Sequence, residues 1–165
     1  MTYEEVEGLL RTINPTEYEL LEDCSTYRVS ELKTDLLTKR PKNAGIWPTK
    51  MLILTDGKEH AIGIVIFWGN ADILIQMLPE YCGKGYMSAI HKNGILRSEC
   101  YENQHVKIDK DYVTSMDDLR KKCHLLRLAG LKPDNLDEIY DYMCWFTDFP
   151  GMTGIDKEHF FQELT

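Results

Sequence analysis

Residues 73–90 read ILIQMLPEYCGKGYMSAI and combine three kinds of sequence in a short space. The first six residues are apolar apart from Gln76, which predicts a strand over 72–78. The proline and the two glycines that follow predict a turn over 79–85, because both residue types interrupt regular structure. A helix is then expected from about residue 86 to residue 100.

Two more apolar runs precede this stretch and are separated by turn residues. The run 51–54 ends at Asp56-Gly57, a dipeptide typical of tight hairpins, and the run 61–68 ends at Gly69-Asn70. Strands joined by such short turns pair with their neighbours in opposite directions. The sequence therefore predicts an antiparallel meander of three strands that ends with the strand at 72–78.

The N-terminal part of the chain is polar and is predicted to be helical. A first helix is expected over 4–11 and a second over 15–22, after the break at Asn14-Pro15. Ser30 has the character of an N-cap, so a third helix is expected over 31–37.

Beyond residue 100 the sequence predicts one further strand and several helices. Residues 104–108 are expected to form the strand. Ser115 resembles the start of a capping box and is expected to open a helix that ends at Gly130. Residues 136–146 predict a helix or a mixture of strand and helix, and Asp156 is expected to cap a last helix.

The order of these elements predicts an α+β fold with a mixed, mostly antiparallel sheet flanked by helices. A length of 165 residues is ordinary for one domain, so residues 1–165 are expected to form a single domain. With 43% hydrophobic residues the chain can bury a sizeable core.

Charge and composition narrow the classes of partner. The formal net charge is −8, from 27 acidic against 19 basic side chains. The longest basic run is Arg120-Lys121-Lys122, and a nucleic-acid binder usually carries a longer basic stripe. We therefore expect no nucleic-acid partner, and the acidic field favours cationic ligands such as amines.

Hydropathy and cysteine spacing indicate the compartment and bear on metal binding. No apolar run approaches the roughly 18–20 residues that cross a bilayer, and the acidic start MTYEEVEGLL does not resemble a signal peptide. We expect a cytoplasmic protein with no membrane partner. The five cysteines form no CxxC pair and lie at no zinc-ligand spacing from a histidine, so free thiols and no metal are expected.

The predicted turn has the composition of an anion-binding loop. Gly83 and Gly85 bracket Lys84, and two nearby glycines allow main-chain N–H groups to converge on one point. A helix that begins at Tyr86 would add its unpaired donors to that point, which suits a pyrophosphate. The spacing fits neither a Walker A loop nor a Rossmann fingerprint, and a strand-to-helix turn without any ligand is an open alternative.

Residues 73–90 resemble the central motif of the GCN5-related N-acetyltransferases. The closest branch is that of the ribosomal-protein N-terminal acetyltransferases, whose pattern contains LPEYxGKGY. The general family motif is [QR]xxGx[GA], and Glu80 stands where Gln or Arg is usual. The order of elements extends the resemblance to a core of about 30–135, followed by a helical extension over about 136–165.

The resemblance implies a site for acetyl-CoA as co-substrate. In the family, the backbone of the strand before the turn holds the pantetheine arm, and the turn holds the pyrophosphate. Carried over to this chain, those two groups of cofactor-binding residues are Gln76, Met77 and Leu78, and then Tyr81, Cys82, Gly83, Lys84, Gly85 and Tyr86.

The implied reaction is direct transfer of an acetyl group to a primary amine within a ternary complex. The amine belongs to a peptide or protein acceptor or to a small molecule, and the sequence does not choose between them. Longer acyl chains are also open, as is the choice between a monomer and a homodimer.

The chemistry needs a proton acceptor for the amine, a donor for the developing oxyanion and an acid for the leaving thiolate. Much of the family uses a tyrosine as acid, at a position that Leu126 occupies here. Candidate acids are Tyr112 and Ser115, although N-capping alone explains Ser115. The candidate bases are a group of carboxylates and one imidazole: Glu80, Asp109, Asp111 and His105.

Two alternatives stay open at this point, and one further expectation concerns His91. A water relay can replace a dedicated base. His91, in the helix after the turn, is expected on the protein surface. The absence of a tyrosine at position 126 also favours a second hypothesis, a catalytically inactive domain of the same fold that binds CoA or a protein partner in a regulatory role.

Overall fold

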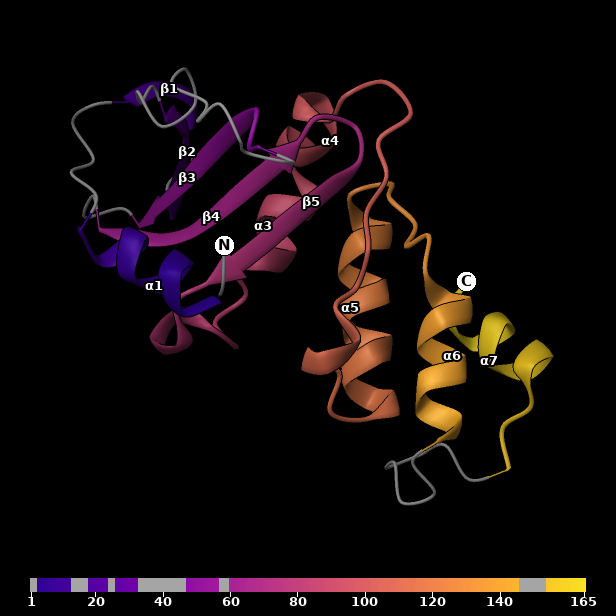
Figure 1. Cartoon of the computed structure of the whole chain (residues 1–165). Helices are drawn as coiled ribbons and strands as arrows, with labels where there is room; N and C mark the ends of the chain where they lie inside the picture. The colour runs from indigo at the N-terminus through magenta and orange to yellow at the C-terminus, as the bar shows by residue number, and fades with distance from the viewer. Residues whose placement is uncertain (1–2, 13–17, 24–25, 33–46, 57–59, 146–153) are drawn as a thin grey trace. The chain divides into compact units, whose positions relative to one another are not determined.

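The computed structural model describes residues 3–12, 18–23, 26–32, 47–56, 60–145 and 154–165 (Figure 1). The chain divides into two compact units, which are described one after the other. The first unit holds Met1–Tyr86 and Tyr101–Gln104, and the second holds Met87–Cys100 and His105–Thr165. That residues 1–165 act as one domain stays a prediction.

The first unit is built on a five-stranded sheet in which each strand pairs antiparallel with the next along the chain. Its middle strands are buried at every position except their ends, which explains their uninterrupted apolar sequence. The strands, in order, are β1 Tyr18–Asp23, β2 Tyr27–Leu32, β3 Lys50–Asp56, β4 Ala61–Trp68 and β5 Asp72–Met77.

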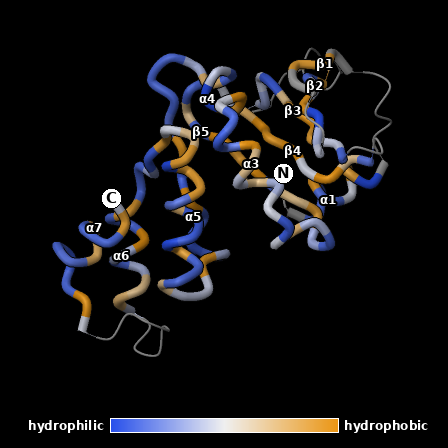
Figure 2. The backbone as a smooth tube through the Cα atoms, turned by 180° about the vertical axis from the view of Figure 1, so that it is seen from behind, coloured by the Kyte–Doolittle hydropathy of each residue, from blue (hydrophilic) through white to orange (hydrophobic). Residues whose placement is uncertain are grey.

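The N-terminal helix α1, Tyr3–Thr12, packs on this sheet. Val6 and Leu10 lie one turn apart on the helix and are almost fully buried. They join a core cluster whose sheet residues are aliphatic or methionine: Leu32, Met51, Ile53, Ile64, Ile66 and Leu78. Figure 2 shows the hydrophobic residues along the central strands.

The structure confirms the helix predicted over 4–11 and the meander that ends at β5. The helices predicted over 15–22 and 31–37 are wrong where the structure describes them, because residues 18–23 and 27–32 form β1 and β2. Ser30 is a buried strand residue rather than an N-cap. Pairing with β3 buries Tyr27 and Val29, and this tertiary gain outweighs local helix propensity.

The second unit is helical in its described residues. Its elements are α3 Tyr86–Lys92, of which Tyr86 belongs to the first unit, α4 Ile95–Glu99, the 3-10 turn η2 Lys110–Tyr112, α5 Met116–Leu128, α6 Leu136–Cys144 and α7 Lys157–Leu164. The single helix predicted over 86–100 is broken, because Gly94 adopts a left-handed φ of 79° between α3 and α4.

The strand predicted over 104–108 is wrong, since the segment is extended but belongs to no sheet. Val106 and Ile108 are buried, and their main-chain groups bond to residues of the loop before α6. The Asn135 amide donates to the Ile108 carbonyl at 2.7 Å and accepts from the Ile108 N–H at 3.0 Å, as a neighbouring strand would. All strand pairs in the described residues are therefore antiparallel, and the sheet is not mixed.

The predicted ends of α5 and α7 are confirmed. The Ser115 hydroxyl accepts from the Asp118 N–H at 3.1 Å, and the Asp156 carboxylate accepts from the His159 N–H at 2.8 Å. At the other end of α5, Gly130 has a left-handed φ of 72° and follows the last turn, as predicted.

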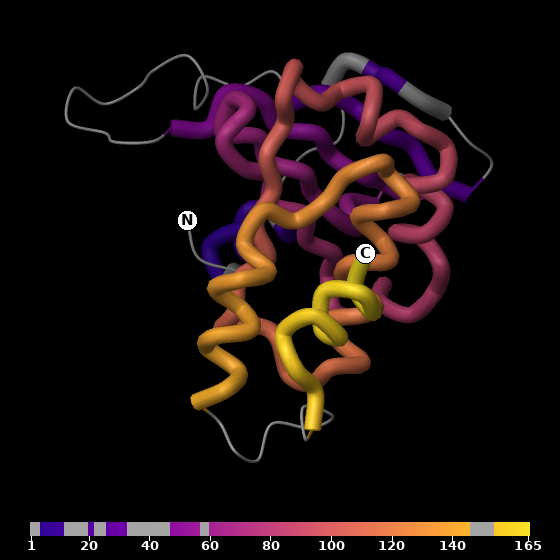
Figure 3. The backbone as a smooth tube through the Cα atoms, turned by 90° about the vertical axis from the view of Figure 1, so that its right-hand side faces the viewer, coloured from indigo at the N-terminus to yellow at the C-terminus, as the bar shows by residue number. Residues whose placement is uncertain are grey.

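The last three helices pack through an aromatic and aliphatic core. The Phe160 ring is fully buried and lies edge-on to Tyr140, with 5.0 Å between ring centroids. The Arg127 guanidinium donates to the Leu164 carbonyl at 3.1 Å, which ties α5 to the end of α7. Figure 3 shows α7, in yellow, beside α6. No helix in the described residues is long and apolar enough to cross a membrane.

Candidate anion-binding turn

The turn after β5 is held in place by main-chain hydrogen bonds up to Cys82. The Leu78 N–H donates to the Ile62 carbonyl at 2.8 Å, so the chain follows β4 to the end of the strand. A 3-10 turn, η1 Pro79–Tyr81, comes next, and the Cys82 N–H donates to the Pro79 carbonyl at 3.2 Å. The start of the turn is thus fixed to the sheet.

The two glycines of the predicted anion-binding loop lie beyond this fixed start. Gly83 and Gly85 have left-handed φ angles of 73° and 84°. A Cβ atom at either position would meet nothing within 4 Å, so conformation rather than crowding calls for glycine here. In the described part of the chain, no acceptor receives the N–H of Gly83, Lys84 or Gly85. These exposed main-chain donors are therefore available to an external anion.

Two aromatic rings close the base of the turn. Tyr81 and Tyr86 meet edge to face, with 6.1 Å between ring centroids, and Tyr81 also packs on the core cluster. The Lys84 ammonium lies 5.3 Å from the centre of the Tyr81 ring. Burial raises the pKa of the Tyr81 hydroxyl. The turn therefore carries one cation beside two packed aromatic rings.

The strand that leads into the turn is the last one of the sheet. Residues Gln76 and Met77 pair with Ile64 and Gly63 of β4, and no described strand pairs with the other side of β5. Met77 packs closely on Gly63, where a Cβ atom would lie 2.6 Å from the Met77 sulfur. Leu78 is buried in the core cluster. Two of the predicted pantetheine-binding residues, Gln76 and Met77, thus lie on an edge strand that packs closely against β4, and Leu78 directly follows it.

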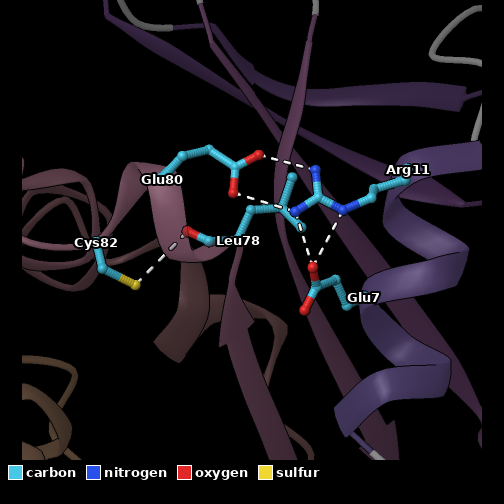
Figure 4. Close-up of polar contacts among 5 residues, drawn as sticks. All are labelled: Glu7, Arg11, Leu78, Glu80 and Cys82. Carbon is cyan, nitrogen blue, oxygen red and sulfur yellow. Dashed lines mark hydrogen bonds and ion pairs between the residues drawn. The ribbon is translucent and has the colours of Figure 1, made fainter.

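Glu80 forms an ion pair that its sequence position did not reveal. The Arg11 guanidinium, from α1, donates to the two Glu80 carboxylate oxygens at 2.8 and 3.2 Å (Figure 4). It also donates to Glu7 from Nε at 3.1 Å and from Nη2 at 2.8 Å. The hydrogen bond from Arg11 lowers the pKa of Glu80, so this candidate base is a weaker proton acceptor than an ordinary glutamate.

Arg11 is the residue near this turn that sequence reasoning missed. The spacing of Glu7 and Arg11 on a predicted helix indicates a local ion pair. Nothing local indicates the contact with Glu80, because the two residues are 69 positions apart and meet only when α1 packs on the sheet.

Cys82 is exposed, and its thiol donates to the Leu78 carbonyl at 3.6 Å (Figure 4). This contact turns the sulfur back toward η1. The four cysteines in the described residues, Cys82, Cys100, Cys123 and Cys144, are free thiols. Cys24 lies outside the described residues.

The two candidate acids belong to the second unit, whereas Glu80 belongs to the first. Tyr112 ends η2 and is 42% exposed. The Ser115 hydroxyl is the N-cap of α5 and accepts from the Asp118 N–H, which is the N-capping role given above as the alternative for this residue. Leu126, at the position where the resemblance implies a tyrosine, is buried on α5 and has an aliphatic side chain with no proton to donate.

The remaining candidate bases are held by local contacts within the second unit. The His105 Nδ1 atom lies 2.7 Å from a carboxylate oxygen of Asp134. Asp109 caps η2 by accepting from the Asp111 N–H at 3.0 Å. His91 is 1% exposed, which corrects the expectation of a surface position, and its Nδ1 atom donates to the Met87 carbonyl at 2.6 Å.

Comparisons with known proteins identify no relative of this chain. No protein-family model matches the chain, and neither a curated protein nor a solved structure matches it. The described residues include no group of three or more side chains that is able to hold a metal ion.

Proposed function

We propose that this protein is an N-acetyltransferase that moves an acetyl group from acetyl-CoA to a primary amine. The observation that carries the proposal is the exposed turn at Gly83–Gly85, whose main-chain N–H groups have no acceptor in the described residues. The resemblance of residues 73–90 to the N-acetyltransferase motif is the reason for proposing acetyl-CoA as the ligand of that turn.

The turn suits a diphosphate for physical reasons. Two left-handed glycines present consecutive N–H donors without a side chain in the way, and Lys84 adds a positive charge. The helix that follows, α3, has only seven residues, so its dipole adds little and the main-chain donors carry the binding. The acetyl-CoA pyrophosphate is an anion of suitable size for such a cradle.

The edge position of β5 supports the same ligand. A pantetheine arm contains two amide groups, and an edge strand is able to hydrogen-bond such groups through its main chain. Gln76 and Met77 lie at the end of that strand, directly before the turn. One extended molecule can therefore follow the strand edge and reach the turn.

In the proposed reaction the acceptor nitrogen attacks the thioester carbonyl carbon. A C–N bond forms, the C–S bond breaks, and the sulfur leaves as the thiolate of CoA. The amine loses one proton and the thiolate gains one, so no redox partner is required. Tyr112 and Ser115 are the proposed proton donors. A water relay is the proposed route for the amine proton, because the Glu80 carboxylate is engaged by Arg11, which also lowers its pKa.

A second candidate function is a regulatory domain that binds CoA without turnover. Two observations favour it: Leu126 is buried and aliphatic where the family has its acid, and Glu80 is engaged in an ion pair. Both candidates share the anion-binding turn and differ only in catalysis.

Calorimetric titration with acetyl-CoA tests the shared part of the two candidates. The full chain is expected to bind, and Gly83→Ala is expected to weaken binding about tenfold, because alanine disfavours a left-handed φ. Gly69→Ala is the matched control, since Gly69 also has a left-handed φ, of 55°, and open space around it. Equal affinity of the wild type and Gly83→Ala would contradict the proposed site.

Release of CoA thiol across a panel of amines separates the two candidates. Thiol release above the rate without amine supports the transferase. Binding of acetyl-CoA with no release on peptide, lysine, polyamine or aminoglycoside amines would favour the regulatory domain.

A further inference from the structure

Arg11 and its two carboxylates form a charge cluster at the entrance to the turn. Glu80 lies three residues before Gly83, and its side chain is 47% exposed. Arg11 bonds to Glu80 on one side and to Glu7 on the other, and Figure 4 shows its guanidinium between the two carboxylates. The cluster lies wholly within the first unit.

A bare carboxylate at position 80 would oppose binding of a diphosphate at this turn. The protein already has a net charge of −8, and Lys84 is the one cation within residues 82–85. Like charges a few residues apart repel one another at ordinary ionic strength, because the Debye length is about 8–10 Å. Glu80 must therefore be neutralised or turned away before an anion can bind.

The hydrogen bonds of Arg11 decide how it acts. A guanidinium has five N–H donors, and here Nε, Nη1 and Nη2 are all engaged by carboxylate oxygens. Little donor capacity is left for a phosphate. Arg11 is thus placed to hold and neutralise Glu80, rather than to contact the ligand itself.

We propose that Arg11 is a positioning residue that holds the Glu80 carboxylate in an ion pair and offsets its charge, so that the turn at Gly83–Gly85 accepts the diphosphate of acetyl-CoA. The inference rests on the proposed function, and it assigns to α1 a role in cofactor affinity. Glu7 fixes the guanidinium from the other side and keeps it on Glu80.

A double-mutant cycle tests this role by measuring acetyl-CoA affinity in the full chain. Arg11→Met is expected to weaken binding about three- to tenfold, because it exposes the Glu80 charge to the ligand. Glu80→Gln is expected to bind at least as well as the wild type. The double variant is expected to bind within about twofold of Glu80→Gln, because no charge is left at position 80 for Arg11 to offset.

Salt and a matched arginine separate electrostatics from stability. At about 1 M salt the Debye length is about 3 Å, so the deficit of Arg11→Met is expected to shrink toward the wild type. Arg120→Met is the control: Arg120 also bonds to two carboxylates, Asp117 at 2.9 Å and Glu163 at 2.8 Å, and is 40% exposed. It is expected to leave the affinity unchanged.

Each contrary result has a distinct meaning. If the wild type does not bind acetyl-CoA, the proposed function fails. If the wild type binds and Arg11→Met binds equally well, only the role of Arg11 is overturned. A deficit that persists in the double variant, or one that Arg120→Met reproduces, also overturns it, since Arg11 would then contact the ligand or act through general stability.

Discussion

Two glycine-containing turns of this protein have similar backbone angles and opposite hydrogen bonding. Gly83 and Gly130 have left-handed φ angles of 73° and 72°. At the end of α5, the Gly130 N–H donates to the Arg127 carbonyl and the next N–H, of Leu131, donates to the Leu126 carbonyl, both at 2.9 Å. At the turn after β5, the N–H of Gly83 has no acceptor in the described residues.

The difference separates a structural glycine from a candidate binding glycine. The turn at Gly130 is a helix cap whose donors serve the helix itself. A side chain there would also collide, because a Cβ atom would lie 2.6 Å from the Arg97 guanidinium. The turn at Gly83 has open space and donors to spare. Substitutions at the two sites are therefore expected to affect different measurements.

The largest effect is expected from Gly83→Glu. A glutamate at this position adds a negative charge and a bulky side chain where the diphosphate would lie, so affinity for acetyl-CoA should fall by about 100-fold or more. Calorimetric titration measures the change, and Gly83→Gln, of similar size without the charge, is the control. Unchanged affinity in Gly83→Glu would remove the turn from the site.

Gly63→Ala is expected to disturb the base of the turn. The added Cβ atom would lie 2.6 Å from the Met77 sulfur and 3.0 Å from the Gln76 carbonyl oxygen, so the end of β5 must move. Overpacking of this kind costs about 1–3 kcal/mol of unfolding free energy. Urea unfolding measures the loss, and acetyl-CoA affinity should fall in the folded variant. A loss of stability with full affinity would separate β5 from the binding site.

Gly130→Ala is expected to cost about 1–2 kcal/mol of unfolding free energy, because alanine disfavours a left-handed φ and meets Arg97. Affinity for acetyl-CoA should be unchanged. In Gly83→Ala, by contrast, affinity for acetyl-CoA should fall clearly, by more than the unfolding free energy alone would indicate. Urea unfolding and calorimetry on both variants make the comparison. Loss of affinity in Gly130→Ala of the same size as in Gly83→Ala would erase the distinction between the turns.

The smallest effect concerns a polar atom that is buried rather than exposed. His91 is 1% exposed, and its Nε2 atom has no hydrogen-bond partner in the described residues. Burial lowers the pKa of His91. The unfolded chain therefore binds a proton that the folded chain refuses, and stability falls as the pH drops below about 6.5.

Urea unfolding at pH 7.5 and pH 5.5 measures this effect. The difference in unfolding free energy between the two pH values is expected to be smaller in His91→Leu than in the wild type. His124→Leu, at an exposed position on α5, is the control for replacing a histidine on a helix. An equal difference in wild type and His91→Leu would show that His91 does not contribute.

Elements with a strong local signal could be predicted from the sequence. The runs that form β3, β4 and β5 are apolar and end at glycine-containing turns, and Ser115 and Asp156 are caps with side-chain acceptors. Residues 18–23 and 27–32 could not be assigned in this way. Their glutamates and leucines favour a helix, and only pairing across the sheet makes them strands.

In the candidate site, too, features with a local sequence signal were predicted, and features that depend on tertiary packing were not. The left-handed glycines at 83 and 85 follow from the motif, because few other residues adopt that conformation. The contact between Arg11 and Glu80 depends on how α1 packs on the sheet, which no local pattern reveals. Likewise, the sequence of residues 104–108 predicts an extended segment but does not show its partner. That partner is the Asn135 side chain, which bonds to Ile108 in place of a neighbouring strand.

Two-dimensional proton–nitrogen NMR of the full chain, titrated with acetyl-CoA, tests the central claim most directly. Because the proposed ligand accepts from main-chain donors, the amide signals of Gly83, Lys84 and Gly85 should shift downfield and saturate together, while the amide of Gly130 stays in place. Unmoved amides at 83–85, with or without shifts elsewhere, would contradict the account.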